Sequence, residues 1–162
     1  MTSPQQRFRQ LMGRFVTGIT VIAVQSDDEH ISAMTANAVT AVSLDPLLFL
    51  CCIRNESGML PGLLARGVFS VNILSAGQDC ISSHYGGKRM AVSPAVWNRN
   101  ENGVPLLQGA NASFVCRVDS SHRAGDHTVI FGAVEAMTAV ERPEKALVYA
   151  AGRYQDIPLA AS

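Results

Sequence analysis

The sequence predicts a mainly β protein: an antiparallel barrel with short helices packed around it. Three observations predict this class. About six segments of strand length are apolar or alternating, polar or Gly- and Pro-containing turns separate them, and strands do not alternate with long helices as in a parallel sheet. The chain has 162 residues, a length typical of one domain, so residues 1–162 are expected to form a single unit.

The first element is an amphipathic helix that begins at Ser3. The Ser3 side chain can cap the helix, Pro4 suits the first helical position, and Gln6 completes a capping box. Apolar residues follow at helical spacing on one face, namely Phe8, Leu11, Met12 and Phe15. We expect this face to be part of the core.

Strands are predicted wherever the chain is apolar or alternates over a short stretch. These stretches are residues 19–24, 30–36, 47–53, 68–74, 112–119 and 129–140, and residues 146–150 are a short apolar segment. Residues 37–46 are expected to be a loop ending in a turn at 43–46, residues 120–128 a connection, and the tail from Arg153 extended. Two short helices are also expected, one capped by Ser57 and one opened by a capping box of Ser75 and Gln78.

Residues 85–108 form the one long irregular stretch. Long loops in compact domains are usually functional or disordered, and Trp97 within this stretch indicates packing. Lys88 and Arg89 follow Gly86-Gly87 and are either solvated loop charges or cations that close over a phosphate.

Composition excludes several classes of partner. Thirteen basic and thirteen acidic residues cancel without forming a basic run, which disfavours nucleic acid. No signal-type segment and no apolar stretch of about 20 residues occur, so we expect a cytoplasmic protein without a membrane span. With 48% apolar and only 16% charged residues, a buried subunit interface is favoured.

The cysteines and histidines do not predict a metal centre. Four cysteines without a CxxC pair indicate buried free thiols in a reducing cytoplasm. Cys116, His122 and His127 come nearest to a ligand set but lack a fourth ligand at a recognisable spacing, so no metal is expected.

Two short motifs are candidates for binding chemistry. The segment Thr35-Ala36-Asn37-Ala38 has small, uncharged side chains that would let a flat, polar-edged cofactor approach the backbone, although polar turns between strands are common. No dinucleotide fingerprint or P-loop is present, so a nucleotide-like cofactor would need another scaffold. Gly125-Asp126-His127 is a tight turn in which His127 either binds a carboxamide or phosphate, donates a proton, or caps the loop.

Taken in order, these segments resemble the short-chain flavin reductases, the reductase components of two-component flavin monooxygenases, and especially the 4-hydroxyphenylacetate 3-monooxygenase reductase group. The resemblance is carried by residues 18–21, 34–38, 42–46, 69–74, 125–127, 147–149 and 153–154. It implies a homodimeric FMN-binding split β-barrel that transfers hydride from NADH or NADPH to FMN or FAD. A partner flavin-dependent monooxygenase would receive the reduced flavin.

The resemblance also implies a set of site residues. Those expected to bind the flavin are Met34, Thr35, Ala36, Asn37, Ala38, Val42, Ser43, Cys52, Ile53, Asn55, Ser57, Lys88 and Arg89. His127 is the expected catalytic residue beside the nicotinamide, and Tyr154 is expected to contact the same substrate. Alternatives are a split-barrel enzyme similar to pyridoxamine-phosphate oxidase, a corrinoid reductase, and a flavin carrier without turnover. The choices of NADH or NADPH and of FMN or FAD stay open.

Overall fold

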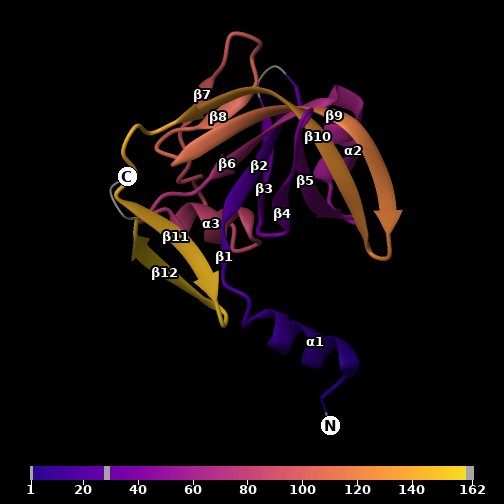
Figure 1. The fold of residues 1–162 in the computed structure, drawn as a ribbon, viewed down its shortest axis with the longest axis vertical. Helices are drawn as coiled ribbons and strands as arrows, with labels where there is room; N and C mark the ends of the chain where they lie inside the picture. Colours follow the sequence, from indigo (N-terminus) through magenta and orange to yellow (C-terminus); the bar gives the residue numbers. More distant parts are fainter. Residues whose placement is uncertain (1, 28–29, 160–162) are drawn as a thin grey trace.

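The computed structural model describes residues 2–27 and 30–159 (Figure 1). Its main feature is a seven-stranded antiparallel sheet. Across the sheet the strands follow the order β3 (Ile31–Ala36), β2 (Thr20–Gln25), β6 (Val68–Ile73), β9 (Ala112–Ala124), β10 (His127–Ala139), β5 (Leu47–Arg54) and β4 (Val39–Leu44). The two edge strands, β3 and β4, are consecutive in the chain. The predicted mainly β, antiparallel fold class is confirmed.

Two small sheets and three helices complete the described part of the chain. One sheet contains β1 (Thr17–Gly18), β11 (Lys145–Ala150) and β12 (Arg153–Pro158), and the other contains β7 (Trp97–Arg99) and β8 (Pro105–Leu107). The helices are α1 (Pro4–Met12), α2 (Met59–Arg66) and α3 (Asp79–Tyr85). Figure 1 shows α1 standing away from the rest of the molecule.

Two apolar clusters stabilise this arrangement. One is enclosed by the large sheet and by α2, whose Met59, Leu60 and Leu63 are buried in it. Gly132 of β10 faces this cluster, and a Cβ there would lie 2.8 Å from the Phe69 ring. The second cluster lies where α3, β8 and β11 contact β2, and it includes residues from each of these elements: Ile81, Leu107, Leu147 and Val21. Burial on two sides therefore explains the apolar character of β2.

A buried amide connects four strands at the second cluster. Asn72 of β6 is fully buried, and its Nδ2 donates to the Val21 carbonyl (3.0 Å) and to Ser70 Oγ (3.0 Å). Its Oδ1 accepts from the Leu107 N–H (2.9 Å) and from Ser113 Oγ (2.8 Å). All four hydrogen-bonding positions of this amide are filled, so Asn72 holds β8 against the large sheet.

The first helix begins as predicted, but its apolar face is not in the core. The capping box is present, with Ser3 Oγ accepting from the Gln6 N–H at 3.2 Å. The four apolar residues are exposed instead, with Phe8 at 67%, Leu11 at 43%, Met12 at 50% and Phe15 at 67%. Helical spacing identifies an apolar face but not the surface that covers it. The prediction that this face belongs to the hydrophobic core is therefore wrong for the single chain described here.

Two expected loops are strands. Residues 39–44 form the edge strand β4, because pairing with β5 satisfies their backbone groups. Residues 120–128 were expected to be a connection, but β9 continues to Ala124 and β10 begins at His127. Only Gly125, with φ of 62°, and Asp126 form the turn. The resulting long hairpin places His127 at a strand end.

The later helices start differently from the prediction. The N-cap of α2 is Gly58 rather than Ser57, although Ser57 Oγ accepts from the Met59 N–H at 3.3 Å. Only half of the expected capping box forms before α3: Gln78 Oε1 accepts from the Ser75 N–H at 3.0 Å, but the Ser75 hydroxyl donates to the Gly109 carbonyl. Residues 85–108 include the unexpected β7–β8 hairpin.

Other expectations concern single residues. Trp97 packs against the second cluster and donates to the Tyr85 hydroxyl at 3.3 Å, as expected of a packing residue. Cys51 and Cys116 are buried, and burial raises the pKa of each thiol to about 12. Cys80 is exposed, so the expectation of a buried thiol is wrong there. None of the described helices has the length and apolarity needed to cross a bilayer.

Candidate functional site

A groove follows the edge strand β3 and the short segment that connects it to β4. It consists of three adjoining cavities that all include Met34, and we call them the inner, middle and outer cavities of the β3 groove. Their volumes are about 240, 500 and 710 Å³ respectively. An unpaired strand edge presents backbone N–H and C=O groups, so this location suits a ligand with polar edges.

The inner cavity is lined mainly by small, uncharged residues of two strand ends. Its walls are the segment 34–38, Cys52 and Arg54 of β5, and His127 of β10. The Cys52 N–H donates to the Ala38 carbonyl at 3.0 Å, and His127 pairs with Arg54 in the sheet. Sheet pairing thus brings the two sequence-predicted motifs, 35–38 and 125–127, to one cavity.

The hydroxyl of Thr35 and the side-chain amide of Asn37 already donate within the protein. Thr35 Oγ1 donates to the Ser82 carbonyl at 2.7 Å, and Asn37 Nδ2 donates to Thr17 Oγ1 at 3.3 Å. The backbone N–H groups of Asn37 and Ala38 lie outside the strand ladder and donate to no other group in the described residues. Along the segment 34–38, backbone amides rather than the Thr35 and Asn37 side chains are therefore the groups available to a ligand, while Arg54 and His127 line the opposite strand ends.

His127 is oriented by its neighbour in the turn. Its Nδ1 lies 2.8 Å from Asp126 Oδ1, and this hydrogen bond lowers the pKa of the Asp126 carboxyl. The His127 side chain is 36% exposed, and Nε2 bonds to no other described residue. With one ring nitrogen fixed, the other is available to a ligand.

The middle and outer cavities have a different chemical character. Arg54, Glu56 and Ser57 line the middle cavity together with Gly86 and Gly87. Ser57 also belongs to the outer cavity, which contains His84, Tyr85 and Arg89. Each of these two cavities has one arginine in its lining, Arg54 in the middle and Arg89 in the outer, and arginine is suited to bind the phosphates of a nucleotide-like ligand.

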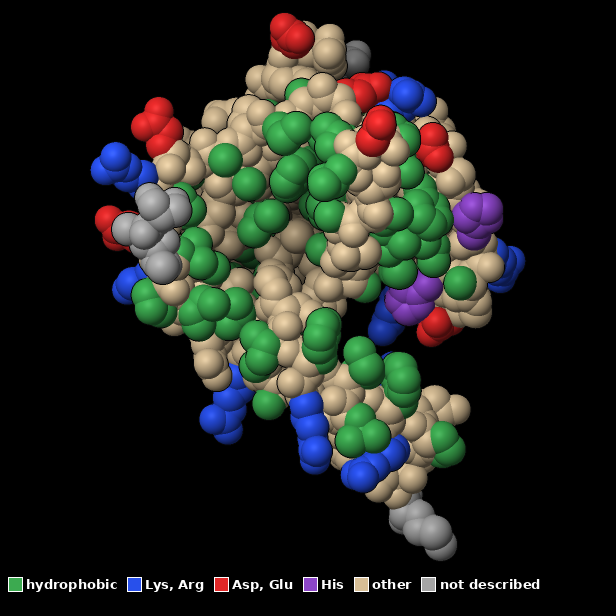
Figure 2. Space-filling view, in the orientation of Figure 1, with side chains coloured by type: hydrophobic (Ala, Val, Ile, Leu, Met, Phe, Trp, Pro, Cys, Tyr) green, Lys and Arg blue, Asp and Glu red, His purple; other side chains and the backbone are tan. Residues whose placement is uncertain are grey.

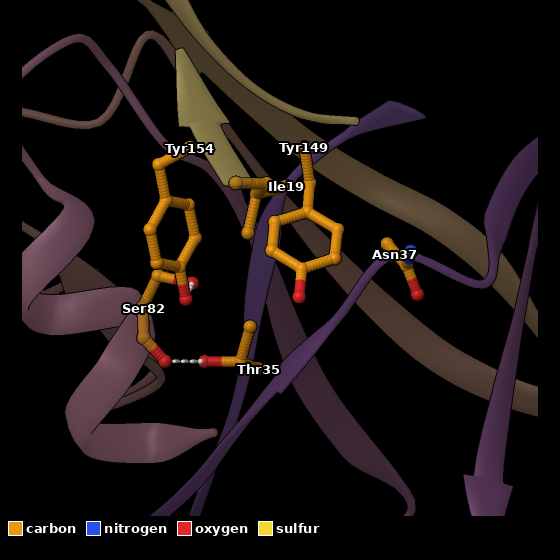
Figure 3. A pocket seen from close by; sticks show the side chains of 6 residues that line it. All are labelled: Ile19, Thr35, Asn37, Ser82, Tyr149 and Tyr154. Atoms are coloured by element: carbon orange, nitrogen blue, oxygen red, sulfur yellow. Dashed lines mark hydrogen bonds between the residues drawn. The ribbon is translucent and has the colours of Figure 1, made fainter. Parts of the chain in front are cut away.

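A fourth, smaller cavity of about 190 Å³ adjoins the inner cavity through Thr35 and Asn37 (Figure 3). Tyr149 and Tyr154, which pair across β11 and β12, line its far side with ring centroids 5.3 Å apart. The Tyr154 hydroxyl lies 3.0 Å from Ser82 Oγ. Tyr154, predicted to contact the substrate, is thus beside the inner cavity rather than within it.

Several predicted site residues do not line the groove. Val42 and Ser43 lie on β4, where Ser43 Oγ accepts from the Asp45 N–H at 3.2 Å. The Ile53 side chain is buried in the apolar cluster between the large sheet and α2. The Asn55 side chain donates to the Gly125 carbonyl (3.0 Å) and accepts from Thr128 (2.7 Å), supporting the turn before His127. Lys88 is also absent from the groove lining, whereas Arg89 is present. For the residues outside the groove, the predicted contacts with a flavin stay predictions.

Sequence reasoning missed three residues near this site. Arg54 lines both the inner and the middle cavity, and its place at the end of an apolar strand just before Ser57 was a usable signal. Ser82 and Tyr149 reach Thr35 and Asn37 only through tertiary folding. No group of three or more His, Cys, Asp or Glu residues able to hold a metal occurs in residues 2–27 and 30–159.

Comparison with known proteins agrees with this architecture. The family model "Flavin reductase like domain" matches residues 12–158, and the chain belongs to this family. It is 35% identical over 147 residues to the FMN reductase (NADH) SmoA of Agrobacterium fabrum, covering 91% of this chain and 83% of that protein. It is 37% identical over 145 residues to HsaB, the reductase subunit of a flavin-dependent monooxygenase of Mycobacterium tuberculosis, covering 88% and 77%.

A solved structure extends the similarity to the whole fold. The NADH:FAD oxidoreductase SgcE6 of Streptomyces globisporus, in complex with NAD and FAD fragments, superposes with a TM-score of 0.87 at 32% identity. The match covers 100% of this chain and 99% of that chain. The predicted enzyme class, an NAD(P)H-dependent flavin reductase, and the predicted use of FMN or FAD are confirmed at this level.

Proposed function

We propose that the β3 groove is where this flavin reductase brings a reduced nicotinamide and a flavin together for hydride transfer. The observation that carries the proposal is the inner cavity, which is lined by His127 and by Asn37 and Ala38, two residues whose backbone N–H groups donate to no other described group. When bound, the flavin supplies the hydride-accepting ring. The protein's own contribution is binding, orientation and electrostatic stabilisation.

The residues of the groove fit a flavin. Small side chains in the segment 35–38 leave the backbone of β3 accessible, as a flat ring requires. The two free amides are suited to stabilise negative charge on the edge of the ring. Arg54 and Ser57, which line the middle cavity, are suited to hold the ribityl phosphate.

His127 orients the nicotinamide in this proposal. Its Nδ1 is held by Asp126, so Nε2 can bond to the carboxamide without a change in the ring's orientation. Hydride transfer requires no proton from this side chain. His127 therefore acts by positioning the substrate, and its loss should affect nicotinamide binding more than flavin binding.

The reduced flavin would leave this chain for a separate flavin-dependent monooxygenase. This part of the proposal rests on the similarity to HsaB, which is the reductase subunit of such a system. The same similarity, and the SmoA and SgcE6 relatives named as NADH-dependent reductases, favour a reductase over the carrier and the other split-barrel enzymes. The four free thiols are compatible with the cytoplasm as the proposed compartment.

The proposed assembly is a homodimer. The apolar face of α1 has no partner within the described chain, and Figure 2 shows hydrophobic side chains gathered on this projecting helix. Helix α1 makes an exposed amphipathic arm, and an exposed apolar face of this kind is typical of an interface. A second copy of the chain is the proposed occupant, which fits the low charge content of the sequence.

Steady-state kinetics test the function directly. The purified protein, mixed in turn with each pair of NADH or NADPH and FMN or FAD, should oxidise the nicotinamide with at least one pair. His127→Ala should raise the nicotinamide KM by about tenfold, the value of one hydrogen bond to a charged or strongly polar group, and leave flavin affinity unchanged. His122→Ala is the matched control, because His122 is exposed on β9 and outside every groove cavity. Equal kinetics of the two variants would remove His127 from the site.

A further inference from the structure

The middle cavity contains a carboxylate at the place where the proposed function puts a phosphate. Among the described residues, its lining includes one arginine, Arg54, and one acid, Glu56, and no other side chain of either charge. The formal charge of the lining is therefore zero. Arginine binds phosphate through charge-assisted hydrogen bonds, and a carboxylate in the same cavity opposes that attraction.

The Glu56 carboxylate has no partner of its own in the described part of the chain. Its side chain makes no hydrogen bond or ion pair with another described residue, and this includes Arg54, two residues away. Glu56 is also exposed. A carboxylate that no cation pairs within the protein acts on whatever charge enters the cavity, so Glu56 must affect the binding of an anion there.

Backbone hydrogen bonds hold the turn that contains Glu56. On one side of it the Asn55 N–H donates to the Asp126 carbonyl at 3.0 Å. On the other side the Ser57 N–H donates to the Arg54 carbonyl at 3.0 Å. The turn between β5 and α2 is therefore fixed at both neighbours of Glu56, and its backbone cannot move away from the cavity without breaking these bonds.

The positive charge of Arg54 also acts on a second carboxylate. The pKa of the Asp126 carboxyl is lowered mainly by the hydrogen bond to His127 and, to a smaller extent, by the charge of Arg54. One guanidinium thus lies near Asp126 and shares the middle cavity with Glu56. A phosphate monoester has nearly two negative charges at neutral pH, so its charge would exceed the positive charge that this lining offers.

From these observations we propose that Glu56 is an affinity-determining residue that keeps the flavin exchangeable. Its carboxylate repels the ribityl phosphate that Arg54 and Ser57 attract, so the flavin is released after reduction instead of staying as a resident group. This inference rests on the proposed function, which places the phosphate in the middle cavity. Because differences in affinity lie mainly in the dissociation rate, the repulsion should shorten the residence of the flavin on the chain.

Equilibrium titration followed by flavin fluorescence, without nicotinamide, measures the effect. Two unit charges about 6–8 Å apart in water change an affinity by about two- to threefold, so removing one charge beside a phosphate should change it by about three- to tenfold. Glu56→Gln should therefore tighten FMN by about three- to tenfold. Riboflavin has the same ring and ribityl chain without the phosphate, and its affinity should change by less than about twofold.

Two further variants are matched controls. Glu56→Asp keeps the charge and should bind FMN within about twofold of the wild type. Glu101→Gln removes an exposed acid outside the three groove cavities and should have no effect. In stopped-flow displacement, Glu56→Gln should release FMN more slowly than the wild type by about the factor gained in affinity. High salt should reduce the gain, because it screens exposed charges.

The outcomes separate this inference from the proposed function. An FMN affinity of Glu56→Gln no higher than that of the wild type would overturn the role of Glu56, as would an equal gain for FMN and riboflavin. Weaker binding of both flavins would show that the carboxylate accepts a hydrogen bond from the ribityl chain, which also overturns it. Arg54→Gln tests the phosphate position separately, and should weaken FMN by about tenfold but not riboflavin. Failure of the wild type to oxidise NADH would defeat the proposed function, while the titrations would still decide the role of Glu56.

Discussion

The Asn72 amide offers the sharpest stability prediction. Asn72→Leu preserves the approximate volume of the side chain but removes all four of its hydrogen bonds. The Leu107 N–H and the Ser113 hydroxyl would then be buried without their acceptor. Each such orphaned group costs about 1–3 kcal/mol, so we expect a loss of about 2–5 kcal/mol in the free energy of unfolding.

Thermal unfolding followed by circular dichroism measures this loss. For a chain of this length, about 1 kcal/mol corresponds to about 2–4 °C, so Asn72→Leu should lower Tm by about 5–15 °C. Asn98→Leu is the matched control, because Asn98 is exposed on β7. Adding Ser113→Ala to Asn72→Leu removes one orphaned hydroxyl and should restore about 1 kcal/mol or more. A Tm for Asn72→Leu as high as that of the control would refute the assignment.

Three further predictions concern the arm, the groove and the turn. Phe8→Ser should shift the protein from dimer to monomer in light scattering, since it places a hydroxyl on the exposed apolar face of α1; an unchanged mass would contradict the proposed interface. Cys80, which is exposed, should react readily with a thiol reagent, while Cys52 should react slowly, because burial raises the pKa of its thiol, and more slowly still with FMN bound. Equal Cys52 labelling with and without FMN would argue against the inner cavity. Because the His127 hydrogen bond lowers the pKa of the Asp126 carboxyl, Asp126 stays ionised until the pH falls through that lowered pKa. Asp126→Ala, which removes the acceptor, should therefore raise the nicotinamide KM at neutral pH and lose its effect only in strong acid; a wild-type KM at neutral pH would show that this bond does not orient His127.

The sequence was most informative where a local pattern has one structural solution. The capping box at Ser3 determines where α1 begins, because both of its hydrogen bonds are made within four residues. Alternating and doubly apolar segments indicated the strands and hence the fold class. The motif around Asn72 was recognisable as part of the family resemblance, yet its role in bonding β8 was visible only in three dimensions.

The loop predictions at 39–44 and 120–128 failed for a shared reason. Residues 120–128 are mostly polar, and the apolar residues of 39–44 do not alternate strictly with polar ones, so periodicity does not distinguish a strand from a loop in either segment. Each segment becomes a strand because the neighbouring strand offers partners for its backbone groups. The consequence is functional, since the extended β9–β10 hairpin brings His127 to Arg54 and the inner cavity.

By itself the sequence determined a mainly β chain of one family, with 35–38 and 125–127 as its candidate binding segments. Tertiary structure decided how these segments contribute. In the folded chain Thr35 donates to the Ser82 carbonyl and Asn37 donates to Thr17, whereas the backbone N–H groups of residues 37–38 are left for a ligand. It also left the apolar face of α1 outside the core. Both outcomes depend on contacts between residues that are distant in the chain. Local periodicity in the sequence does not encode such contacts.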